Sequence, residues 1–131
     1  MTTKTGEKRL GAILLVEDDP LILALIEELI ASTGRKVITA RNGLEARERV
    51  EQHPDLAAVI TDLAMPEMDG TKLIEWLSRE RPKLPVVVIT GTSERQSGGA
   101  LDRFKLLGVI RKPLTDDKID RLLETLDSLD A

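Results

Sequence analysis

Cysteine is absent from the 131-residue chain, and so are apolar runs long enough to cross a membrane. Without cysteine the protein has no disulfide, no thiolate zinc site and no thiol nucleophile, and a reducing cytoplasm is the compartment that fits best. The longest apolar runs, 12–16 and 21–26, are too short for a membrane span. Residues 1–10 lack the apolar centre of a secretory signal. We therefore expect a soluble, cytoplasmic protein.

An excess of positive charge is also missing. The chain has 23 acidic and 19 basic residues, which gives a net charge of −4 at pH 7 and a pI near 5.1. A nucleic-acid-binding domain normally carries a basic patch or stripe, and a protein that binds anionic membranes needs clustered Lys and Arg. We therefore expect neither nucleic acid nor a membrane among the direct partners.

The length and the apolar content fit one compact domain. Apolar residues make up 41% of the sequence, and a chain of this size buries roughly two-thirds of the surface that its unfolded form exposes. No segment has the length or composition of a linker that would divide the chain. We expect a flexible N-terminal segment over residues 1–10 and a single domain over residues 11–131.

Five short apolar blocks predict β-strands. Four of them are nearly continuous apolar runs, which is typical of strands covered on both faces, because a half-exposed strand would alternate apolar and polar residues. The blocks are Ala12–Val16, Lys36–Ala40, Ala57–Thr61, Pro85–Thr90 and Gly108–Arg111.

Longer amphipathic segments with recognisable ends lie between these blocks and predict helices. Asp19, Asn42 and Thr115 each have a side chain suited to capping a helix N-terminus. The predicted helices are 20–33, 43–52, 70–81, a fourth from about 100, and a last one after Thr115 with an apolar face of Ile119, Leu122, Leu123, Leu126 and Leu129.

The fourth helix is weakened by Gly98 and Gly99, because each glycine costs about 1 kcal/mol relative to alanine in a helix. We expect this helix to start late, near Ala100, after a mobile loop over 93–99. Phe104 is expected to lie on it as a core residue.

Five strands that alternate with five helices predict an α/β fold, with a parallel sheet and helices on both of its faces. Ligands of such sheets bind at the carboxyl ends of the strands. The residues at these ends are Glu17, Asp18 and Asp19 after the first strand, Asp62 after the third, Thr90 after the fourth, and Lys112 with Pro113 after the fifth.

Several carboxylates, one hydroxyl and one ammonium are thus expected at one edge of the sheet. Closely packed carboxylates repel one another unless they are protonated or bind a metal, and a hard cation such as Mg²⁺ prefers oxygen ligands. The hydroxyl and the ammonium suit the oxygens of a phosphoryl group. Asp62 is the candidate nucleophile, because it projects alone between the acidic cluster and Lys112 and a carboxylate can form an aspartyl phosphate.

Each of these residues also has an ordinary structural interpretation. Asp19 suits helix capping, and Glu17 with Asp18 would be a solvated acidic turn if the pair stood alone. Asp62 would be an ordinary loop acid, Thr90 a β-branched strand residue, and Lys112 a surface lysine. Their joint placement at four strand ends of one sheet favours a functional site.

Four segments resemble the response-regulator receiver domains, also called CheY-like domains, and the resemblance covers residues 10–129. Leu14–Pro20 resembles the acidic opening of a receiver, and Thr61–Gly70 resembles the segment with the phospho-accepting aspartate. Val88–Gly91 resembles the fourth strand with its switch hydroxyl, and Lys112–Pro113 resembles the end of the fifth. The resemblance implies a doubly wound, flavodoxin-like sheet with strand order 2-1-3-4-5.

The resemblance also implies a metal site and a phosphoryl acceptor. Asp62 would take a phosphoryl group from a phosphohistidine of a sensor histidine kinase or a histidine phosphotransfer protein. Asp18, Asp62 and the backbone carbonyl of Ala64 would bind Mg²⁺ directly, and Glu17 would bind it through water.

The hydroxyl of Thr90 would donate to the phosphoryl oxygen, and Lys112 would pair with the same charge. Positioning and charge neutralisation do most of the work in such an in-line transfer. The peptide after this lysine is often cis in the family, so Lys112–Pro113 is a candidate cis bond, which proline permits at low cost.

Three features depart from the family pattern. Val109 stands where receivers usually have Tyr or Phe, and Lys105–Leu106 replaces the usual Gly-Ala. The pair Gly98 and Gly99 weakens the fourth helix. All three fall on the face of the fourth helix, the fifth strand and the fifth helix, where receivers commonly signal or dimerise. Output is therefore expected to run through Thr90 and the loop before the fourth helix.

The leading hypothesis is a phosphorylation-switched signalling module, not an enzyme with an external substrate. It would control a downstream protein partner as a monomer or weak dimer, since nothing near residue 129 resembles a helix-turn-helix. The sequence leaves open a free-standing regulator and the receiver of a larger protein such as a hybrid histidine kinase. A receiver-like adaptor that works without phosphorylation is an alternative that Val109 favours and the complete set of site residues opposes. A small Mg²⁺-dependent phosphatase with an aspartate nucleophile is disfavoured, because 17–19 is not the Asp-x-Asp of haloacid-dehalogenase-like enzymes and no room remains for a substrate cap.

Overall fold

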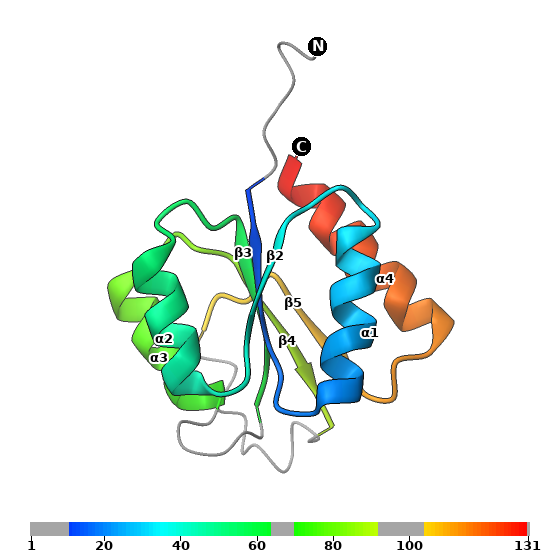
Figure 1. The fold of residues 1–131 in the computed structure, drawn as a ribbon, viewed down its shortest axis with the longest axis horizontal. Coiled ribbons are helices and arrows are strands. Elements are labelled where there is room, and N and C mark those ends of the chain that lie inside the picture. Colours follow the sequence, from blue (N-terminus) through cyan, green and yellow to red (C-terminus); the bar gives the residue numbers. More distant parts are fainter. Residues whose placement is uncertain (1–10, 64–69, 92–103, 131) are drawn as a thin grey trace.

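A parallel sheet of five strands forms the centre of the protein, in a computed structural model that describes residues 11–63, 70–91 and 104–130 (Figure 1). The strand order is β2-β1-β3-β4-β5, and every neighbouring pair is parallel. This is the order that the sequence resemblance implied. The strands are β1 (Ile13–Val16), β2 (Val37–Ala40), β3 (Ala58–Asp62), β4 (Val86–Thr90) and β5 (Gly108–Arg111).

Helices cover both faces of the sheet. In Figure 1, α1 and α4 lie on one face, and α2 and α3 lie on the other. Their bounds are α1 (Pro20–Ala31), α2 (Gly43–Gln52), α3 (Gly70–Glu80) and α4 (Asp116–Asp127), and a 3-10 turn, η2 (Ser128–Asp130), follows α4. Within the described ranges, no helix is long and apolar enough to cross a membrane.

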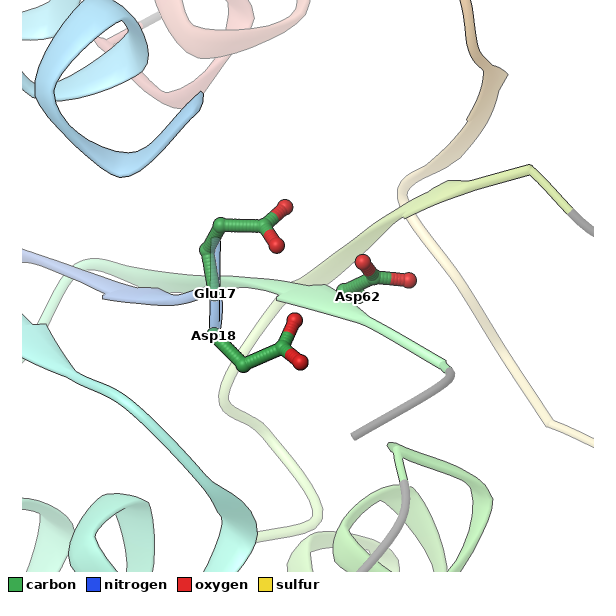
Figure 2. Close-up of side chains that lie close together, drawn as sticks. All are labelled: Glu17, Asp18 and Asp62. Atoms are coloured by element: carbon green, nitrogen blue, oxygen red, sulfur yellow. The ribbon is translucent and has the colours of Figure 1, made fainter. Parts of the chain in front are cut away.

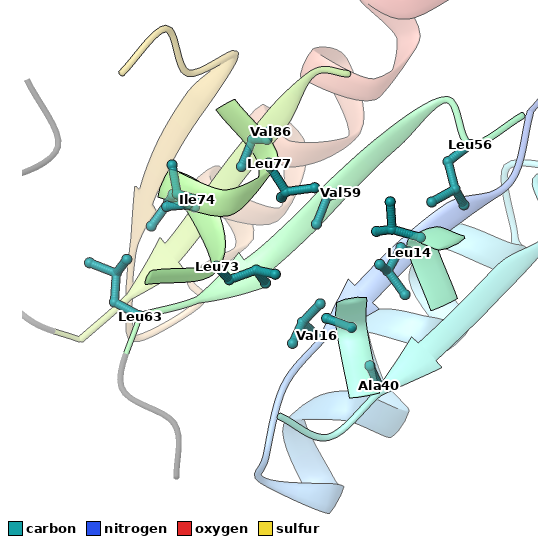
Figure 3. Packing of buried hydrophobic residues seen from close by; sticks show 13 residues of the cluster. Leu14, Val16, Ala40, Leu56, Val59, Leu63, Leu73, Ile74, Leu77 and Val86 are labelled. Atoms are coloured by element: carbon teal, nitrogen blue, oxygen red, sulfur yellow. The ribbon is translucent and has the colours of Figure 1, made fainter. Parts of the chain in front are cut away.

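The three central strands have no polar face, as their continuous apolar runs predicted. Every residue of β1, β3 and β4 is buried. Alternate residues pack against opposite helix layers: Leu14 and Val59 contact the side of α2 and α3 (Figure 3), whereas Ile13 and Ile60 contact the side of α1 and α4. The strands are therefore held rigidly from both faces, which fixes the positions of the residues at their ends.

Two of the three predicted helix caps are made by side chains. Asp19 Oδ1 accepts from the N–H groups of Leu21 and Ile22, at 2.9 and 3.4 Å. Asn42 Oδ1 accepts from the Glu45 N–H at 2.8 Å. Thr115 occupies the N-cap position of α4, but its side chain makes no capping hydrogen bond there.

The chain around the predicted fourth helix departs from expectation where it is described. Phe104 lies in a bend and not in a helix, although its side chain packs against the core as predicted. The loop over 93–99 and the helix start at Ala100 lie outside the described residues. Leu129, predicted on the last helix, lies in η2 and still packs against the core.

Leu14→Ala is expected to lower the free energy of unfolding by about 2–5 kcal/mol, because a fully buried leucine leaves a cavity between the sheet and the helices. Leu21→Ala is the matched control, since Leu21 is 82% exposed and its truncation should change stability by less than about 0.5 kcal/mol. Urea unfolding followed by circular dichroism measures both. Equal losses in the two variants would contradict this description of the core.

Candidate functional site

The sheet register brings the acidic strand ends to the same level. Val16, the last residue of β1, pairs with Thr61, so Glu17 comes level with Asp62 at the end of β3. Asp62 in turn pairs with Ile89, and Thr90 pairs with Arg111, the last residue of β5. The residues expected from the strand ends therefore collect at one edge of the sheet.

Three carboxylates meet at this edge. Carboxylate oxygens of Glu17, Asp18 and Asp62 all lie within 4.8 Å of one another. Figure 2 shows Glu17 and Asp18 reaching from the end of β1 and Asp62 from the end of β3 toward a common space. Glu17 is 2% exposed and Asp62 5% exposed, whereas Asp18 is half-buried. The predicted acidic cluster is thus formed, with its most accessible member at Asp18.

Lys112 bridges two of these carboxylates. Its ammonium donates to Asp62 Oδ2 at 2.8 Å and to Glu17 Oε1 at 3.1 Å. The lysine side chain retains 21% exposure, and both partners are nearly inaccessible. Charge-assisted hydrogen bonds of this length are stronger than neutral ones. Lys112 therefore neutralises part of the negative charge that the strand ends concentrate.

Burial raises the pKa of the Glu17 carboxyl above its ordinary value of 4.5, and repulsion from Asp62 raises it further. The Asp19 N–H, which donates to Glu17 Oε2 at 3.1 Å, opposes this effect, and so does Lys112. For Lys112 itself, burial lowers the pKa, but hydrogen bonds and attraction from Asp62 and Glu17 outweigh it and leave the pKa above 10.5. The ammonium is therefore present throughout the neutral range.

Asp19 differs from its two acidic neighbours. Its carboxylate is exposed and caps α1, while the carboxylates of Glu17 and Asp18 join Asp62. The sequence hypothesis that Asp19 acts as a cap and that Glu17 and Asp18 form the acidic pair agrees with this geometry.

The remaining predicted site residues are Thr90 and Ala64. Thr90 ends β4 and is 2% exposed, and its carbonyl accepts from the Lys112 N–H at 2.9 Å. Ala64 lies outside the described residues. The Lys112–Pro113 peptide is cis, as the resemblance suggested.

The sequence interpretation missed two features of the site. Glu17 was expected only as a water-mediated metal ligand, but it also forms an ion pair with Lys112. Arg41 was not considered, yet it lines an open crevice together with Asp18, Asn42 and Glu45. Arg41 directly follows β2, so the rule that strand ends form the site was sufficient to find it.

The donor set fits a hard divalent cation. Three carboxylates and one ammonium leave two formal negative charges at this edge, and oxygen donors of this kind suit Mg²⁺. The half-buried Asp18 leaves the cluster open on one side. The arrangement can therefore hold a cation beside the Asp62 carboxylate, with the Lys112 ammonium on that carboxylate as well.

Comparison with known proteins agrees with this geometry. The family model of the response regulator receiver domain matches residues 13–124. The polar-differentiation response regulator DivK of Brucella ovis is 32% identical, in an alignment that covers 89% of this chain and 94% of that protein.

Solved structures share the fold. The receiver domain of a signal transduction histidine kinase from Syntrophus aciditrophicus is 28% identical, with a TM-score of 0.80 and coverage of 91% of this chain and 89% of that chain. Response regulator TrrA from Thermotoga maritima, crystallised with Mg²⁺-BeF, is 23% identical, with a TM-score of 0.77 over 89% of this chain and 99% of that chain, and shows the fold alone. With the family model over most of its length and DivK as a relative, the chain belongs to the response-regulator receiver domain family.

Proposed function

We propose that this receiver domain accepts a phosphoryl group on Asp62, with Mg²⁺ bound beside it, and that the modified protein controls a protein partner. The observation that carries the proposal is the position of Asp62. Its carboxylate lies beside those of Glu17 and Asp18 and is hydrogen-bonded to Lys112 at 2.8 Å. A carboxylate in this setting is oriented and surrounded by the charges that phosphoryl transfer requires.

The transfer makes one bond and breaks one. A carboxylate oxygen of Asp62 forms a bond to phosphorus while the bond from phosphorus to the donor imidazole nitrogen breaks. That nitrogen takes the electron pair of the broken bond and a proton from water. Lys112 already contacts Asp62, so its ammonium is in place to pair with the phosphoryl charge. Thr90, at the neighbouring strand end, would donate its hydroxyl to a phosphoryl oxygen.

Asp18, Asp62 and the Ala64 carbonyl would hold Mg²⁺ directly, and Glu17 through water. When bound, the cation offsets negative charge on the phosphoryl oxygens and on the carboxylates. Glu17 would in addition hold Lys112 against Asp62, because it contacts the same ammonium. The three carboxylates thus divide into one acceptor and two supporting groups.

Family membership indicates a signalling module that works with a histidine kinase or a phosphotransfer protein and with downstream targets. We propose a phosphohistidine as the donor. The protein would assist its own phosphorylation and dephosphorylation without turning over an external substrate.

Incubation with acetyl phosphate and Mg²⁺ is expected to add one phosphoryl group to the protein, because the small donor can reach the open edge of the site. Asp62→Asn should abolish the addition, since the amide is not a nucleophile, and EDTA should abolish it too. Asp19→Asn is the matched control, because Asn also caps helices well and Asp19 does not join the cluster. Intact-mass analysis measures all four samples.

Phosphorylation that persists in Asp62→Asn would refute Asp62 as the acceptor. Absence of phosphorylation in the folded wild type, with acetyl phosphate and then with a phosphorylated histidine kinase, would favour the adaptor that works without phosphorylation.

Mg²⁺ is expected to raise the thermal unfolding midpoint of the wild-type protein. At a Mg²⁺ concentration one hundred times the dissociation constant, binding should add about 2.7 kcal/mol to the free energy of unfolding. Asp18→Asn should remove most of this stabilisation, because it deletes an anionic ligand, whereas Asp19→Asn should retain it. Differential scanning calorimetry with increasing Mg²⁺ makes the comparison. Equal stabilisation of Asp18→Asn and the wild type would exclude Asp18 as a ligand.

The pH dependence of stability should reveal Glu17 in metal-free protein. Because burial raises the pKa of Glu17 on folding, the folded state binds the proton more tightly, and the resulting stabilisation is lost as the pH rises from about 4.5 through the folded pKa. The unfolding free energy of the wild type minus that of Glu17→Gln should therefore fall between pH 4 and pH 8. Urea unfolding in EDTA at constant ionic strength tests this, and a difference that rises with pH would show the opposite shift.

A further inference from the structure

A groove that the phosphoryl-transfer proposal does not use lies between α3 and the chain that enters β5. Its volume is about 380 Å³. Its floor is apolar, and Figure 3 shows three of its members, Ile74, Leu77 and Val86, side by side. Leu84, Phe104 and Leu106, which are only partly buried, complete the apolar lining.

Charged side chains line the same groove. Among the described residues they are Arg79 and Arg81 from the α3 side and Lys105 from the opposite wall, against one acidic residue, Glu75. Within this described part of the lining, three cations to one anion is a local excess of positive charge on a chain whose net charge is −4. A ligand of this groove should therefore combine apolar groups with negative charge.

Hydrogen bonds to backbone carbonyls hold both walls in place. The Leu107 N–H donates to the Val86 carbonyl at 2.7 Å, which ties the wall around Lys105 to the first residue of β4. On the other side, the Arg81 guanidinium donates to the carbonyls of Val50 and Pro54, at 3.2 and 2.8 Å. Walls that are ordered before binding reduce the entropy lost when a ligand docks.

The composition of the groove matches a protein contact better than a small-molecule pocket. Small-molecule sites are lined mainly by apolar groups with few polar ones. Of the twelve described residues that line this groove, five are charged or hydroxylated: Glu75, Ser78, Arg79, Arg81 and Lys105. An apolar centre with a charged rim is the usual anatomy of a protein–protein contact. An amphipathic helix meets such a groove with apolar side chains spaced three and four residues apart.

We propose that this groove docks an acidic, amphipathic helical segment of a partner protein. Apolar side chains of the segment would enter above Leu77 and Val86, and its carboxylates would pair with Arg79 and Lys105, which are both exposed. The contact goes beyond the proposed phosphorylation of Asp62 and needs neither Mg²⁺ nor a phosphoryl donor.

The test uses the full chain in EDTA and two designed helical peptides of equal length with identical Leu and Ala positions. One peptide carries Glu at every polar position and the other carries Lys. Heteronuclear NMR titration follows the backbone amides. The Glu peptide is expected to shift the amides of 74–86 and 104–107 and to bind at least about tenfold more tightly than the Lys peptide, a preference of about 1.4 kcal/mol.

Variants test the charge contribution directly. The double variant Arg79→Glu with Lys105→Glu should lose at least about tenfold in affinity for the Glu peptide and gain affinity for the Lys peptide. Lys36→Glu is the control, since it reverses an exposed charge that does not line the groove. The double variant should still take up one phosphoryl group from acetyl phosphate, which separates a failure of this proposal from a failure of the phosphorylation proposal.

Several results would overturn the docking proposal. They are the absence of amide shifts with the Glu peptide, equal affinities for the two peptides, or unchanged affinity in the double variant. Shifts centred on Glu17, Asp62 and Lys112 would place the contact at the strand-end site and also overturn it. Decanoate binding that depends on Arg79 and Lys105, with no peptide binding, would assign the groove to a small amphipathic anion in place of a protein segment.

Discussion

The ion pairs of Lys112 with Asp62 and Glu17 are what allow three carboxylates to share one edge of the sheet. Ionised carboxylates at this spacing repel one another, and burial adds a desolvation cost to each. Lys112 contacts the two most buried ones, at 2.8 and 3.1 Å, and leaves the more accessible Asp18 without an ammonium partner among the described residues. One ammonium thus offsets one of the two buried negative charges, and Asp18 adds a further negative charge nearer the solvent, so the edge attracts a cation that approaches from solvent.

This ion-pair network also ties together distant parts of the chain. Lys112 is separated from Asp62 by 50 residues and from Glu17 by 95. Only the parallel topology brings these positions together, because all strands end at the same edge. The free energy gained by burying the apolar strands offsets the desolvation and repulsion of the charges at that edge. Core packing and site electrostatics are therefore parts of one arrangement.

Much of the fold could be predicted from the sequence because the signals are local. A buried parallel strand needs a continuous apolar run, and a helix start needs a capping side chain, so β1 and the Asp19 and Asn42 caps were found from short segments. Thr115 was recognised at its position, but its missing hydrogen bond depends on a rotamer that the sequence does not specify. Phe104 was assigned to the helix expected between the last two strands, whereas it lies in a partly buried bend, and core packing of a single aromatic side chain suits either backbone.

The positions of the candidate site residues could be predicted from the sequence, but the contacts between their side chains could not. The rule that strand ends converge placed Glu17, Asp18, Asp62, Thr90 and Lys112 at one edge. It gave no way to know that Glu17 would pair with Lys112, because that contact depends on side-chain geometry between β1 and the end of β5. Arg41 was missed for a different reason, since the predicted site drew on the ends of the first, third, fourth and fifth strands and not on the end of the second, which Arg41 follows.

The division of charge within the molecule is more informative than the net charge. β4 runs from Val86, on the floor of the positively charged groove, to Thr90, at the acidic edge. Five residues of extended strand separate their Cα atoms by about 13 Å, and every one of them is buried. A single rigid strand therefore connects two surfaces of opposite charge. An acidic helix that suits the groove is repelled by the carboxylate edge, and a cation that suits the edge is repelled by the groove, so the charge distribution keeps the two classes of ligand on separate surfaces.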